Sequence, residues 1–186
     1  PGQTLSARLE ADPANNSAIE GRLYVEVAGQ DDSLETVYGP LVALAPGEAA
    51  EVAWQVTVPE GSPMLWVGLE FGSESRFDGT VYLDTLTWKG EPQCTFGRPQ
   101  HDGTRWLSTW TAACSALSAD PEATYRMIQN EGRGLALMGT RQWRNYTLEA
   151  TLTANLARTM GLAARVQGLR RYYALELTEG SARLVR

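Results

Sequence analysis

Apolar and polar residues alternate one by one along much of the chain. The alternation is clearest in four stretches, TLSARLEA (4–11), RLYVEV (22–27), EVAWQVTV (51–58) and MLWVGLEF (64–71). A period of two places successive side chains on opposite faces of a strand, so each stretch predicts a strand with one covered face. Turn-forming residues separate the stretches, as in GQDDS and PEGSP. Short alternating strands joined by turns indicate an antiparallel β-sandwich.

The phase of each predicted strand divides its side chains into an inward and an outward set. The inward set comprises Leu5, Ala7, Leu9, Leu23, Val25, Val27, Val52, Trp54, Val56, Val58, Leu65, Val67, Leu69 and Phe71. Trp54 is therefore predicted to lie in the core. Tyr24 shares the outward phase with Arg22 and Glu26, and Trp66 shares it with Glu70.

The pattern breaks at KGEPQ (89–93), where the charge balance also changes. Residues 1–92 carry 15 acidic and 4 basic side chains, whereas residues 93–186 carry 7 and 12. We therefore expect two units, 1–92 and 93–186. The net charge of −6 and the scattered basic residues argue against nucleic-acid binding.

The second unit is less regular than the first. TWTAACSAL (109–117) and PEATYRMI (121–128) predict short helices, the latter capped by Asp120. Strands resume at GLALMG (134–139), YTLEATL (146–152), GLAARVQG (161–168) and RRYYALEL (170–177). The predicted inward residues are Tyr146, Leu148, Ala150 and Leu152, then Tyr173, Leu175 and Leu177. Because SARLVR ends in mid-pattern, we expect a sandwich that is cut before its last strands. The sequence thus predicts an all-β protein of two consecutive antiparallel β-sandwich units, with one or two short helices between them.

The reactive side chains limit the chemistry that the chain can perform. Cys94 and Cys114 fit no zinc pattern, and we expect two buried thiols rather than a disulfide. A single histidine, His101, leaves little room for a Ser-His-Asp or Cys-His arrangement. No apolar run approaches the roughly 20 residues of a membrane helix. No targeting segment is recognisable, which slightly favours a cytoplasmic protein.

Three phrases together resemble a known family. They are FDGTVYLDTLTWKGEP (77–92), RMIQNEGRGLALMGTRQWRNYTLEATL (126–152) and GLAARVQGLRRYYALEL (161–177). They resemble the C-terminal, non-catalytic region of bacterial ADP-ribosylglycohydrolase-family proteins, over roughly residues 60–186. The first unit is also similar to jelly-roll carbohydrate-binding modules, and the second to concanavalin- or laminin-G-like sandwiches. The resemblance implies an accessory region of a protein that also has a helical, dimagnesium hydrolase domain, whose acidic pattern has no match here.

The phrase DGTVYLDTLTW contains two aspartates that do not form a catalytic pair. Asp78 and Asp84 are six residues apart, which spans about 20 Å along a strand, whereas glycosidase carboxylates lie about 5–10 Å apart. Asp78 belongs to a turn. The resemblance to jelly-roll modules implies a structural calcium at Asp84, with Glu10, Asp12 or Asn15 as further ligands. The alternative is a hydrogen-bonded structural acid.

Outward aromatic residues are the candidates for sugar stacking. Tyr24 and Trp66 are the candidates in the first unit, although a covered outer face would also explain them. In the second unit, Tyr172 shares the outward phase with Glu176, and Arg165 and Gln167 have the polar phase of the neighbouring strand. Together they predict a polar face for hydroxyl-rich ligands. The arginines at 158, 165, 170 and 171 could contact the diphosphate of an ADP-ribose-like ligand, unless they are only solvated charges.

These observations favour a non-catalytic accessory region that binds carbohydrate or a related ligand through exposed aromatics. One alternative is an assembly module that packs on a hydrolase domain or on another chain, because an incomplete sandwich exposes an edge strand. A second alternative is a small hydrolase that uses carboxylates such as Asp84 and Glu149.

Overall fold

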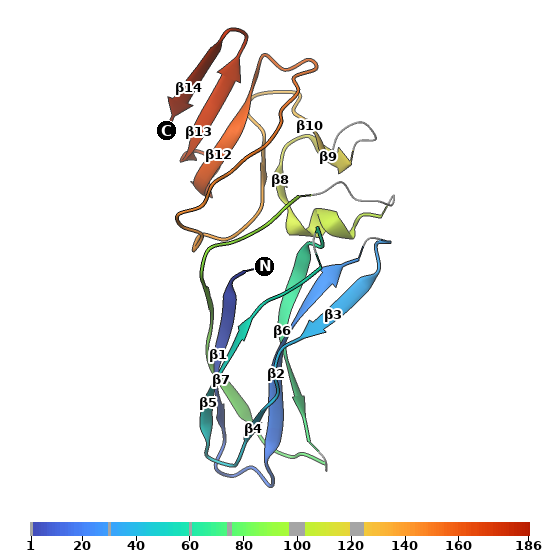
Figure 1. Cartoon of the computed structure of the whole chain (residues 1–186), viewed down its shortest axis with the longest axis vertical. Coiled ribbons are helices and arrows are strands. Elements are labelled where there is room, and N and C mark those ends of the chain that lie inside the picture. The colour runs from blue at the N-terminus through green and yellow to red at the C-terminus, as the bar shows by residue number, and fades with distance from the viewer. Residues whose placement is uncertain (1, 30, 60, 74–75, 97–102, 120–124) are drawn as a thin grey trace.

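The computed structural model describes residues 2–29, 31–59, 61–73, 76–96, 103–119 and 125–186. The molecule is elongated, with the first strands at one end and β12, β13 and β14 at the other (Figure 1). Every strand pair in the described residues is antiparallel, and the regular structure is almost entirely β. The all-β, sandwich-type class predicted from the alternation is confirmed.

The first half of the chain forms two facing sheets. Its described strands are β1 (Thr4–Ala11), β2 (Ile19–Ala28), β3 (Leu34–Tyr38), β4 (Val42–Leu44), β5 (Ala49–Gln55), β6 (Met64–Gly72) and β7 (Val81–Lys89). One sheet has the order β5–β1–β7. In the other sheet, β3 and β4 pair with different parts of β2, and β6 pairs along most of β2. The central strands are therefore β1 and β2, one in each sheet.

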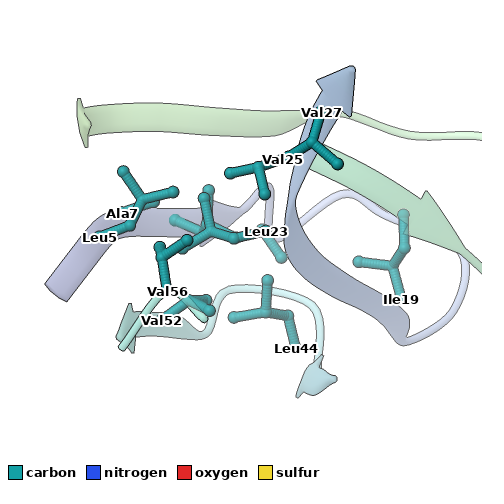
Figure 2. Close-up of a cluster of buried hydrophobic side chains, with 11 residues drawn as sticks. Leu5, Ala7, Ile19, Leu23, Val25, Val27, Leu44, Val52 and Val56 are labelled. Carbon is teal, nitrogen blue, oxygen red and sulfur yellow. The ribbon is translucent and has the colours of Figure 1, made fainter. Parts of the chain in front are cut away.

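The core lies between β1 and β2, as the alternation predicts (Figure 2). Leu9, Leu23, Val25, Val27 and Val52 are fully buried in it. Burying each such side chain stabilises the fold by about 1.5–3 kcal/mol. Other predicted inward residues, including Trp54, Val58 and Leu69, are partly buried against this core.

Strand β6 departs from the predicted phase at one end. The register shifts between Glu26 and Val27, so that Met64, rather than Leu65, lies opposite Val27. This bulge adds one residue to β6 without a partner. Val67 and Phe71 keep the inward phase but stay partly exposed, because β6 pairs with β2 alone.

The second half contains three small antiparallel sheets and one 3₁₀ helix in the described residues. The elements are η1 (Arg105–Thr109), β8 (Thr111–Ala113), β9 (Ala116–Ala119), β10 (Tyr125–Ile128), β11 (Leu135–Leu137), β12 (Thr159–Gly168), β13 (Arg171–Thr178) and β14 (Ser181–Val185). Strands pair as β8–β11, β9–β10 and β12–β13–β14. An aromatic cluster of Trp106, Trp110, Tyr125 and Phe96 packs beside them with ring centroids 5.1–5.5 Å apart. Burial in this cluster raises the pKa of Tyr125.

Two helix predictions and one strand prediction in this half are wrong. TWTAACSAL forms β8 and β9, and the described part of PEATYRMI forms β10. The predicted cap, Asp120, and Pro121 lie outside the described residues. YTLEATL forms no strand, and its predicted inward residue Leu148 is exposed. Both cysteines are free, but neither is buried as predicted, since Cys94 is exposed and Cys114 is half-buried.

Among the residues described, side-chain hydrogen bonds at Asp32 and at Trp88 connect the halves of the chain. The carboxylate of Asp32, in the β2–β3 turn, accepts hydrogen bonds from the backbone N–H of Arg105 at 2.9 Å and of Thr104 at 3.3 Å. Trp88 of β7 donates its indole N–H to the Thr140 hydroxyl at 3.2 Å. Asp32 thus supplies a partner for the N-terminal donors of η1, which the helix itself cannot satisfy. The predicted division between residues 92 and 93 stays a prediction.

Candidate functional site

The outer face of the β3–β2–β6 sheet brings aromatic and charged side chains together in cross-strand rows. In the register, Glu26 lies between Thr36 and Trp66, and Tyr24 lies between Tyr38 and Gly68. Arg22 lies opposite Glu70, and Glu20 opposite Gly72. Directly opposed residues have Cβ atoms about 4.5–5.5 Å apart on the same face. We call nine of these ten residues, all except Gly72, the platform: Glu20, Arg22, Tyr24, Glu26, Thr36, Tyr38, Trp66, Gly68 and Glu70. Figure 1 shows the three strands that carry them.

The aromatic rings of the platform are open to ligand to different extents. Trp66 is 53% exposed and Tyr38 is 45% exposed. Tyr24 is half-buried, and its ring centroid lies 6.1 Å from that of Tyr38 at an angle of 56°. The ring lies directly over Gly68, where an added Cβ would be 2.2 Å from Cζ of Tyr24. Gly68 therefore makes the space in which Tyr24 lies against the sheet.

The charged groups of the platform fall into one pair and two unpaired acids. Arg22 donates from Nε to a carboxylate oxygen of Glu70, and its Cζ lies 3.7 Å from the ring centroid of Tyr38. Glu20 and Glu26 have no hydrogen-bond or ion-pair partner within the described ranges. A depression of about 250 Å³ lies beside Arg22 and Glu70, and Leu41 and Phe71 also line it. The platform thus offers stacking rings, hydrogen-bonding groups and excess negative charge.

The predicted site residues do not form one surface. Tyr24 and Trp66 lie together on the platform, as their phase predicts. Tyr172 was predicted to point outward with Glu176, but it is only 7% exposed. Arg165 and Gln167 are exposed on β12, where the register is irregular between Ala164 and Gly168. The predicted polar face of Arg165, Gln167 and Tyr172 is therefore absent.

Tyr172 is buried because its face of β13 carries an ionic cluster. Glu176 is also 7% exposed, and its carboxylate accepts hydrogen bonds from Arg183 at 2.8 and 3.0 Å. Arg133 lies 3.0 Å from the other carboxylate oxygen and donates to the Tyr172 hydroxyl at 2.8 Å. The Tyr172 hydroxyl, and then Glu176, raise the pKa of Arg133. The hydroxyl and the carboxylate are satisfied inside the fold, which is the usual condition for burying polar groups.

The opposite face of this sheet carries apolar side chains toward solvent. Tyr173 is 41% exposed and Leu175 is 42% exposed, although both were predicted to point inward. Leu184 lies opposite Leu175 in the register and is 76% exposed. The two faces of β13 are therefore reversed relative to the prediction.

Arg165 and the other arginines considered for diphosphate binding are exposed. Arg165 has a φ of 54°, and its backbone N–H donates to the Tyr146 hydroxyl at 2.8 Å. Arg158, Arg170 and Arg171 are likewise exposed. The structure shows no carboxylate, ring or hydroxyl organising these four guanidinium groups into a shared site within the described residues.

The residues predicted to bind calcium, Asp84 and Asp12, make other interactions in the structure. Asp84 is exposed and lies 3.6 Å from Nε of Arg8, and it is the extra residue where the β1–β7 register shifts. Asp12 accepts from the Ala14 N–H at 2.8 Å and from the Tyr82 hydroxyl at 2.8 Å. The Ala14 N–H, followed by the Tyr82 hydroxyl, lowers the pKa of Asp12. A guanidinium beside Asp84 and protein donors on Asp12 do not fit a cation site, which needs six to eight oxygens.

Asn15, another predicted calcium ligand, also makes hydrogen bonds within the fold. Its side chain is buried and exchanges two hydrogen bonds with the backbone of Thr80, at 2.7 and 3.0 Å. Across the ranges that the structure describes, no group of three His, Cys, Asp or Glu side chains could hold a metal ion. The calcium interpretation of Asp84 gains no support from these contacts and stays a prediction, since Asp84 lies on the surface beside Arg8.

Tyr38 and the Arg22–Glu70 pair are platform residues that the sequence reasoning did not select. Thr36 and Tyr38 alternate with Glu35 and Val37. This alternation is too short to predict a strand by itself. Pairing the stretch across the GQDDS turn would have aligned Tyr38 with Tyr24. The missing information was the register between strands.

No protein-family model matches the chain, and neither a curated protein nor a solved structure matches it. Among the described residues, no helix is long and apolar enough to cross a membrane. The resemblance to the ADP-ribosylglycohydrolase family stays a prediction. Function is therefore inferred from the chemistry of the platform.

Proposed function

We propose that this chain is a non-catalytic, glycan-binding accessory region, and that the platform is its binding face. The observation that carries the proposal is the exposed ring of Trp66 beside Tyr24, Tyr38 and paired and unpaired charged groups on one sheet face. A flat, exposed indole stacks on the C–H face of a sugar ring, while carboxylates and a guanidinium bind its hydroxyl groups. In the parent protein, this region would accompany a helical ADP-ribosylglycohydrolase-type domain.

The absence of catalysis is part of the same proposal. Asp84 and Glu149, the carboxylates of the hydrolase alternative, are both exposed. A carboxyl group that acts as a general acid is usually held in a desolvated pocket, and a partner carboxylate lies close to it. Neither condition is met at Asp84, which lies beside Arg8 instead.

We expect Trp66→Ala to abolish most glycan binding. Removing a central tryptophan from a binding face costs about 2 kcal/mol or more, which corresponds to roughly 30-fold in affinity. A glycan array, followed by calorimetry on each oligosaccharide that binds, measures the loss. Gly68→Ala is expected to weaken the same ligands, because the new methyl group would displace the Tyr24 ring.

Gly168→Ala is the control, since an added Cβ at Gly168 also meets no atom within 4 Å. Gly168 lies on β12, away from the platform, and this variant is expected to keep wild-type affinity. A wild-type chain that binds no glycan on the array would refute the proposal. Unchanged glycan binding by Trp66→Ala would show that the binding site does not lie on the platform.

The assembly alternative is favoured by the exposed side chains of Tyr173, Leu175 and Leu184 on β13 and β14. If two copies of this chain associate through these residues, size-exclusion chromatography with light scattering is expected to give a mass above 20.3 kDa. Leu184→Asp would then return the single-chain mass, because a carboxylate cannot be buried there without a partner. A single-chain mass for the wild type at all concentrations excludes self-association.

A further inference from the structure

The platform carries more negative charge than its own cation can neutralise. Three glutamates, at positions 20, 26 and 70, share it with Arg22. Arg22 is engaged by Glu70 and lies over the ring of Tyr38. The carboxylates of Glu20 and Glu26 have no partner among the residues described. An occupant that brings cations would supply the missing partners.

Glu26 is placed where it can act together with the main stacking ring. It lies directly opposite Trp66 in the register, so a group at the edge of a stacked sugar would meet the carboxylate. A hydroxyl group at that edge would gain one hydrogen bond. An ammonium group would gain a charge-assisted hydrogen bond and a cation–π contact with the indole. A carboxylate or sulfate on the sugar would be repelled.

The acids also follow one another along the platform. Glu26 and Glu20 are six residues apart on β2, about 20 Å at about 3.3 Å per residue, and Glu70 lies between them in the register. Such a row fits a linear ligand whose positive groups repeat along its length. The strongly acidic first half, with 15 acidic and 4 basic residues among positions 1–92, adds long-range attraction for a polycation.

We infer that the platform selects glycans built from amino sugars with free amino groups, of the glucosamine type, over neutral and acidic glycans. This inference rests on the proposed function of the platform. The amino groups would lie at Glu26, and further along at Glu70 and Glu20, while a sugar ring stacks on Trp66.

Three β-1,4-linked hexamers with matched backbones test the inference by calorimetry: glucosamine, N-acetylglucosamine and glucose. A galacturonic acid hexamer serves as the acidic probe. The glucosamine hexamer is expected to bind most tightly, and its affinity alone is expected to fall with added salt, because exposed charges are screened. Glu26→Gln is expected to weaken the glucosamine hexamer roughly tenfold, equivalent to about 1.4 kcal/mol, while the affinity for the glucose hexamer is unchanged.

Glu51→Gln is the matched control, since Glu51 is an exposed acid on β5 of the opposite sheet. It is expected to leave every affinity unchanged. If Glu51→Gln weakens the glucosamine hexamer as much as Glu26→Gln does, the preference is only general attraction to an acidic protein and the inference is overturned. The inference is also overturned if the neutral hexamers bind at least as tightly as the glucosamine hexamer and lose that binding in Trp66→Ala. Such a result would leave the proposed function standing. If no hexamer binds, the inference fails, and the glycan array alone decides whether the proposed function stands.

Discussion

Leu23→Ala is expected to lower the free energy of unfolding of the first sandwich by about 2–5 kcal/mol. Leu23 is fully buried on β2, in the cluster that joins the two sheets (Figure 2). The substitution removes one methine carbon and two methyl carbons from a close-packed interior. The sheets on both sides keep the resulting cavity from collapsing. Because whole-domain stabilities are about 5–15 kcal/mol, this single change would remove a large share of the total.

The matched control is Leu156→Ala, since Leu156 is 99% exposed. Surface truncations away from special features change stability by within about 0.5 kcal/mol. Urea denaturation of the two variants and the wild type, with the transition midpoint and slope fitted separately, gives the comparison. Equal midpoints for Leu23→Ala and the wild type would contradict the assignment of this cluster as the core.

Gly161→Ala is expected to disrupt the β12–β13–β14 sheet, at a cost of about 3 kcal/mol. Gly161 lies opposite Glu176 in the β12–β13 register. An added Cβ would be 2.2 Å from the backbone oxygen of Leu175 and 3.2 Å from the Cα of Glu176. These are backbone atoms of the neighbouring strand, so relief requires β12 and β13 to separate rather than one side chain to rotate.

Amide hydrogen exchange measures this effect locally, since the ladder amides of β12 and β13 should lose protection while those of β1 and β2 keep it. Gly168→Ala provides the control on the same strand, because nothing lies within 4 Å of an added Cβ there. It is expected to leave protection unchanged. Wild-type protection in Gly161→Ala would mean that the two strands do not approach each other this closely.

Alternation was sufficient to predict the first sandwich because each of its sheets has one covered face. Leu5, Leu9, Leu23 and Val25 are inward by their spacing alone and are buried in the structure. The same reasoning placed Tyr24 and Trp66 outward, where they form part of the platform. Two-residue periodicity therefore predicted the core and the two platform aromatics Tyr24 and Trp66.

The second half could not be predicted in the same way, for two physical reasons. A short apolar run such as TWTAACSAL fits a helix or a strand equally well, and tertiary pairing made it β8 and β9. On β13, hydrophobicity indicated that Tyr173 and Leu175 are buried. The ionic cluster of Glu176 with Arg133 and Arg183 instead buries the polar side, and Arg133 is 43 residues away in the sequence.

The position of β1 has a consequence for the order in which the first sandwich can form during synthesis. β1 begins at Thr4, yet its two neighbours are β5 and β7, and Thr4 lies opposite Lys89. β2, β3 and β4 are close in sequence and can pair first, whereas β1 waits for strands made much later. Pairings over such sequence distances form slowly, because loop closure precedes any gain from contacts. The ribosome must therefore release residue 89 before β1 has both of its sheet neighbours.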